Sequence, residues 1–159
     1  MAWTNSKIFR EWMVTAYQAA GTGFTGLDSD VINAALFNNT VTPDQDAVVG
    51  STGFNTGTWV TGNEVTDATN WVAGGRALAS KTFTTPAAAT MRFDAADLAG
   101  GGNVTITNAF GTLVYDNTIT AGTVAKQGVS FHYFGGAQSV TSGTFTVIWH
   151  ANGINQWTM

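Results

Sequence analysis

The chain has 159 residues, a length that one domain with a single hydrophobic core accommodates. Only 10% of the residues are charged, against about 25% in ordinary soluble domains, and the net charge is −4 with six basic residues scattered along the chain. The scattered basic residues argue against a surface that binds nucleic-acid phosphates. The lack of Cys excludes disulfides and thiolate metal sites. No apolar run approaches the roughly 18 residues of a membrane span. The low charge is typical of a protein that copies of itself or other partners cover.

The first predicted element is an amphipathic helix over residues 6–20. Ser6 or Thr4 can cap its start and Gly21 can end it. Two interpretations of this helix, with residues 1–21 as a unit, remain open: it packs on the domain's own sheet, or it is an arm that grips a neighbouring subunit. Its apolar residues recur at the helical spacing of one buried face, at Ile8, Phe9, Trp12, Met13, Ala16, Tyr17 and Ala20.

The remainder, residues 22–159, is predicted to be β structure. Residues 31–37 are expected to form a buried strand and residues 47–58 a long surface loop. Residues 61–78 are expected to form two strands joined by a constrained corner, where Asn70 and the pair Gly74-Gly75 let the backbone turn. Further short strands rich in Thr, Val and aromatic residues are expected at 77–83, 90–93, 103–107, 111–115, 129–134 and 144–150.

These short, evenly spaced strands predict an all-β fold, a single-domain β-sandwich of jelly-roll type that carries the N-terminal helix. In the last strand Phe145, Val147 and Trp149 face one way and Thr144, Thr146 and Ile148 the other, so one face of it is predicted to be core. The triplet 100–102 is all glycine and is expected to form a flexible hairpin tip, and Asn152-Gly153 a turn.

Few residues resemble a metal or catalytic site. His132 and His150 could approach each other, but no further ligand has a suitable spacing, and a packed or interface histidine is the better interpretation of His132. Two short acidic stretches, Asp28-Ser29-Asp30 and Asp44-Gln45-Asp46, lack the glycine and distal glutamate of a calcium loop and are expected to form turns.

Paired carboxylates for glycosidic cleavage could come from Asp94, Asp97 and Asp116, but their separation decides that chemistry and the sequence does not give it. No serine lies in a nucleophile-elbow pattern, and the glycine triplet lacks the lysine and helix of a phosphate loop. We therefore predict a protein that is not an enzyme and has no catalytic residue, cofactor or metal.

Several stretches of the chain resemble a family of small virion proteins of tailed bacteriophages. No single motif among them is chemically diagnostic, but together with the first seven residues they extend over most of the chain. They are residues 34–39 (Ala-Ala-Leu-Phe-Asn-Asn), 42–44, 63–65, 71–78 (Trp-Val-Ala-Gly-Gly-Arg-Ala-Leu), 93–97, 110–116, 131–136 (Phe-His-Tyr-Phe-Gly-Gly) and 143–149.

The resemblance implies a structural protein of the particle, and members of this size look like capsid decoration proteins. It implies two partners, the major capsid protein and other copies of the chain, which could associate as a trimer. It also implies that the chain is made in the host bacterial cytoplasm and then lies on the capsid surface. Nucleic acid and membranes are not expected as partners. The alternative is a tail component: a tube or tip protein, or a module that binds cell-wall carbohydrate through Trp59 or Trp71.

Large aromatic side chains are the favoured anchors of such contacts, because they bury much area for few lost rotamers. The residues predicted to form the interface are Trp3, Phe9, Trp12, Trp59, Trp71 and Trp157.

Overall fold

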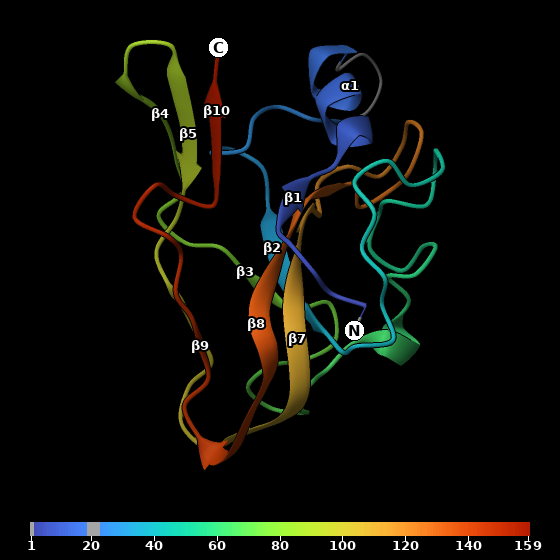
Figure 1. The fold of residues 1–159 in the computed structure, drawn as a ribbon, viewed down its shortest axis with the longest axis vertical. Coiled ribbons are helices and arrows are strands. Elements are labelled where there is room, and N and C mark those ends of the chain that lie inside the picture. The colour runs from blue at the N-terminus through green and yellow to red at the C-terminus, as the bar shows by residue number, and fades with distance from the viewer. Residues whose placement is uncertain (1, 19–22) are drawn as a thin grey trace.

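A computed structural model of the chain describes residues 2–18 and 23–159 and has an all-β fold with one short helix near its start (Figure 1). All strand pairs are antiparallel. The elements are β1 (Lys7–Ile8), α1 (Arg10–Gln18), β2 (Ile32–Phe37), the 3-10 turn η1 (Thr61–Asn63), β3 (Arg76–Ala77), β4 (Thr82–Ala87), β5 (Thr90–Asp94), β6 (Leu98–Ala99), β7 (Val104–Asp116), β8 (Gly128–Gly143), β9 (Thr146–Val147) and β10 (Asn155–Thr158).

Within the described residues the strands form three sheets. Five strands make the central sheet in the order β1-β8-β7-β2-β3, three make a small sheet in the order β10-β5-β4, and β6 pairs with β9. Figure 1 shows the small sheet at the same end of the molecule as α1, with the β9 segment along one side of the central strands. The small sheet and the helix therefore define one end of the fold.

The all-β prediction is confirmed, but the two longest strands were predicted as shorter pieces. The predicted strands 103–107 and 111–115 are one strand, β7, and the predicted strand 129–134 is the first part of β8. The left-handed residue Asn108 in β7 (φ 57°) and Gly135 in β8 (φ 82°) accompany shifts in the pairing register. Such bulges bend a strand without ending it, so turn-forming residues inside it do not mark its boundary.

The helix is shorter at its start than predicted. Lys7 and Ile8 pair with β8 as a strand, and α1 begins at Arg10. The predicted end at Ala20 and Gly21 lies outside the described residues. Phe9 and Trp12 are buried in the hydrophobic core of this chain, which supports the interpretation of a helix packed on its own domain.

Residues 61–78 do not form the predicted pair of strands. Their first part holds η1 and single bridges from Glu64 to Phe37 and from Asp67 to Trp71, and only Arg76–Ala77 pairs with β2 as a strand. The predicted corner is present, since Gly74 and Gly75 both have left-handed φ angles.

The prediction of a surface loop over residues 47–58 is correct in part. The segment holds no named strand, and Val48 and Val49 are exposed, but residues 52–54 are not on the surface. Thr52 and Phe54 are buried; the Thr52 carbonyl accepts a hydrogen bond from the Gly128 N–H at 3.1 Å, and Phe54 stacks on Tyr115 with ring centroids 4.8 Å apart. Residues 100–102 connect β6 to β7, which belong to different sheets, so the predicted hairpin tip is wrong.

Aromatic side chains fill the core around Trp59. Its ring lies 5.7 Å from Trp3, 5.9 Å from Phe9, 5.1 Å from Phe37 and 6.0 Å from Phe131, mostly edge to face. Edge-to-face contacts add to the free energy gained from burying each ring. The predicted core face of residues 145–149 is confirmed, because its three apolar side chains are buried, although only Thr146–Val147 form a strand there.

Candidate docking surface

The small sheet has one apolar and one polar face. Period-2 alternation along its strands places Phe83 of β4, Met91 of β5 and Trp157 of β10 on one face. Trp157 is paired with Met91, and the rings of Phe83 and Trp157 lie 5.7 Å apart. The opposite face carries the cross-strand row Thr84, Arg92 and Gln156.

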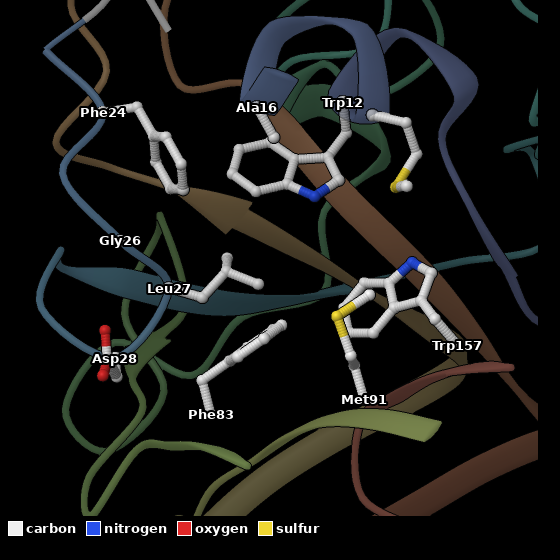
Figure 2. A pocket seen from close by; sticks show the side chains of 10 residues that line it. Trp12, Ala16, Phe24, Gly26, Leu27, Asp28, Phe83, Met91 and Trp157 are labelled. Atoms are coloured by element: carbon white, nitrogen blue, oxygen red, sulfur yellow. The ribbon is translucent and has the colours of Figure 1, made fainter. Parts of the chain in front are cut away.

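The apolar face of the small sheet looks toward α1 and the loop that follows it. Figure 2 shows Trp12 and Ala16 of α1 above Leu27, Phe83 and Met91, with Phe24 at one side. Trp12 and Phe24 meet edge to face, with ring centroids 4.9 Å apart. Between these walls is a pocket of about 410 Å³, lined by Trp12, Met13, Ala16, Phe24, Gly26, Leu27, Asp28, Phe83, Met91 and Trp157.

The pocket is open to solvent on the side of β4. Every residue of β4 is exposed, and the Phe83 side chain is 43% exposed although it is fully apolar. Trp12 and Leu27, on the other side, are buried. An exposed ring beside an apolar pocket is a feature of surfaces that bind another molecule.

Of the six residues predicted to form an interface, the structure brings only Trp12 and Trp157 to this pocket. Trp3, Phe9, Trp12, Trp59 and Trp71 are at most 1% exposed, because the chain's own core surrounds them, so they are not surface anchors of the described chain. Trp157 is partly exposed, and its interface role stays a prediction. Burial of Trp59 and Trp71 also removes the exposed indoles on which carbohydrate binding was predicted to depend.

A pair of buried carboxyl groups fixes the loop that forms one wall of the pocket. The Asp30 carboxylate accepts hydrogen bonds from the hydroxyl and the N–H of Thr25, the latter at 2.9 Å, and is also bonded to the side chain of Asp116 at the end of β7. Burial, with a smaller contribution from the charge of Asp30, raises the pKa of Asp116 to about 7. Protonated Asp116 can therefore donate to the Asp30 carboxylate.

The pKa of Asp30 moves in the opposite direction. Burial opposes its charged form, but the hydrogen bonds from Thr25 outweigh this and lower its pKa below the ordinary value. In the sequence, Asp30 and Asp116 belong to separate candidate sites. Only the pairing of β2 with β7, which puts Ile32 opposite Asp116, brings them together.

A further carboxyl group, the half-buried side chain of Glu64, was not among the predicted sites. Burial raises the pKa of Glu64 to about 7, and its Oε1 accepts the Gly74 N–H at 2.8 Å. The Gly74 carbonyl accepts the Tyr115 hydroxyl at 2.7 Å. Glu64 thus holds the glycine corner against the central sheet, a structural role that its place in a polar stretch did not indicate.

The two histidines have separate contacts. His132 lies in β8, where its Nε2 is 2.9 Å from the Ser130 hydroxyl and its ring packs on Trp149, and burial lowers its pKa to about 4. His150 accepts the N–H of Asn152 through Nδ1 at 3.1 Å. Among residues 2–18 and 23–159, no three His, Asp or Glu side chains are grouped so that they could hold a metal ion.

The other acidic candidates have local hydrogen-bond partners. Asp44 accepts the N–H of Asp46 at 2.9 Å, which is the turn predicted there, and Asp46 forms an ion pair with Arg10 at 3.2 Å. Asp94 accepts the N–H of Ala95, and Asp97 that of Trp149, both at 2.9 Å. These contacts give the carboxylates structural roles.

Comparison of the chain with protein-family models, curated proteins and solved structures gave no match. In the part of the chain that the structure describes, no helix has the length and apolar character needed to span a membrane.

Proposed function

We propose that the chain is a non-enzymatic structural protein of a tailed-bacteriophage virion, and that it binds the assembled lattice of the major capsid protein as a decoration protein. The observation that carries the proposal is the exposed apolar pocket between α1 and the small sheet, beside a strand that is exposed along its whole length. Such a surface is suited to a partner that covers it.

Two further features support this function. The sequence resembles small virion proteins over most of its length, and its low content of charged residues suits a protein that functions within an assembly. The candidate catalytic carboxylates have structural partners, and Asp116 is buried. The proposal includes self-association of the chain on the capsid surface, with a trimer as one form.

Binding to phage heads tests this function directly. Purified chain is mixed with whole phage particles, heads with tails, that lack it; the particles are sedimented, and the bound material is located by cryo-electron microscopy. We expect density repeated over the head lattice. Binding only along the tail or at its tip would replace this function with that of a tail component, and a failure to bind either structure would refute both virion roles.

A further inference from the structure

The pocket has the size and chemistry of a site for an apolar side chain. Its volume of about 410 Å³ exceeds that of one large side chain, and aromatic, Met and Leu side chains make most of its wall. Met13 and Met91 are unbranched and flexible, so the wall can adjust to what enters. A rigid aromatic wall with flexible methionines is suited to an aliphatic or aromatic group of a partner.

One polar atom of the wall lacks a partner. The Trp157 Nε1–H is buried and makes no hydrogen bond to any described residue, and Figure 2 shows this nitrogen on the side of the indole that faces α1. An unpaired buried donor is unfavourable, because it has lost its hydrogen bond to water and gained none in the fold. A carbonyl oxygen brought in by a partner, with a small movement of a Met side chain, would supply the missing acceptor.

The charge at the pocket favours a basic partner. Asp28 is the single charged side chain among the described lining residues, it is exposed, and it forms no ion pair with another described residue. A second copy of this chain complements it poorly, because the chain carries ten acidic and six basic residues. A Lys or Arg of a different protein would complement the Asp28 carboxylate.

We propose that this pocket docks an extended segment of another polypeptide, with a bulky aliphatic side chain in the pocket, its backbone carbonyl bonded to the Trp157 indole, and a neighbouring Lys or Arg paired with Asp28. The proposal rests on the proposed function for the partner's identity, since the major capsid protein would supply the segment. Recognition by an apolar anchor, one backbone hydrogen bond and one rim charge is common in peptide binding.

NMR of the full chain tests the pocket without any phage component. The six Trp indole N–H signals are recorded while a capped Gly-Lys-Leu-Leu-Gly peptide is added to millimolar concentration, and Trp157→Phe identifies the Trp157 signal. We expect that signal to shift on binding. A peptide with Ser in place of both Leu should not shift it, and one with Glu in place of Lys should bind several-fold more weakly.

Variants on the two faces of β4 provide the matched comparison. Phe83→Ala should weaken peptide binding about fivefold or more because it removes an apolar wall, whereas Thr84→Ala, on the opposite face, should change it less than about twofold. Asp28→Asn should abolish the preference for the Lys peptide over the Glu peptide. Unchanged signals of the indoles outside the pocket, those of Trp3, Trp59, Trp71 and Trp149, confirm that each variant is folded.

The outcomes separate this inference from the proposed function. A Trp157 signal that does not move, or that shifts equally with the Leu and Ser peptides, would overturn the pocket proposal. A shift that depends on protein concentration alone would also overturn it, because the occupant of the pocket would then be a second copy of the chain. If heads bind Phe83→Ala as well as the original chain, decoration stands and the pocket is not the contact. If the peptide binds and heads do not, the pocket stands and decoration fails.

Discussion

Gly75 occupies a site that permits no side chain. Its φ is +71°, and a Cβ on it would lie 2.6 Å from the Cα of Ala35 and closer still to the carbonyl oxygen of Ala34, both in β2. The pairing of β3 with β2 depends on this close approach, since Ala34 pairs with Arg76. The neighbouring glycine, Gly74, also has a left-handed φ, but its Cβ would have space.

We expect Gly75→Ala to lower the free energy of unfolding by at least about 3 kcal/mol, because the new methyl group strains the backbone and forces β3 away from β2. Gly62→Ala is the control: its Cβ would meet nothing within 4 Å, and the change should stay within about 0.5 kcal/mol. Urea unfolding followed by tryptophan fluorescence measures both. Equal stabilities of the two variants would show that the corner adjusts freely.

Helix α1 has two functions in the fold, since it covers the core through Trp12 and forms a wall of the pocket. Trp12 is 1% exposed, whereas Val14, two residues along the same helix, is 50% exposed. The side of the helix that carries Trp12 therefore packs on the rest of the chain, and the side that carries Val14 faces solvent. It also argues that removal of residues 1–20 would unfold the domain and would not release a folded monomer.

Trp12→Ala should therefore cost about 3 to 5 kcal/mol of stability, because it leaves a large cavity between α1 and the sheets. Val14→Ala should cost no more than about 0.5 kcal/mol. Thermal unfolding followed by circular dichroism compares the two. If Trp12→Ala unfolds at the temperature of the original chain, the helix is an arm that the core does not need.

Ionisable groups with shifted pKa values make the free energy of unfolding of the whole molecule depend on pH. Asp116 and Glu64 have pKa values raised to about 7, so the stability that their protonated forms contribute is fully present below their ordinary pKa and is lost as the pH rises to about 7. His132, with its pKa lowered to about 4, has the opposite effect: stability is lost as the pH falls from about 6.5 to 4.

Two carboxyl groups outweigh one imidazole, so we expect the free energy of unfolding to fall by about 2 kcal/mol from pH 5 to pH 7.5. Guanidinium unfolding at a series of pH values measures this. Asp116→Asn should reduce the fall, and Asp44→Asn, at an exposed turn, should leave it unchanged. Stability that rises over this range would refute the assignment of buried, protonated carboxyl groups.

The sequence by itself determined the features that depend on local patterns. Helical spacing predicted α1, an apolar run bounded by polar residues predicted β2, and a short stretch rich in Thr and aromatic residues predicted β5. Alternation predicted the buried face of residues 145–149, and the glycine pair predicted the corner at residues 74–75. These features follow from side-chain direction and backbone sterics within a few residues, which the sequence contains directly. The virion function remains a prediction from resemblance.

Only the tertiary structure decided which aromatic residues are buried and which face solvent. Trp59 and Trp157 have the same side chain, but one is surrounded by rings from distant segments and the other lies on a small sheet with an open side. The continuity of β7, the pairing of Asp30 with Asp116 and the pocket itself likewise require segments far apart in sequence to meet. Strand register and side-chain packing determine these long-range contacts, and no local sequence pattern encodes them.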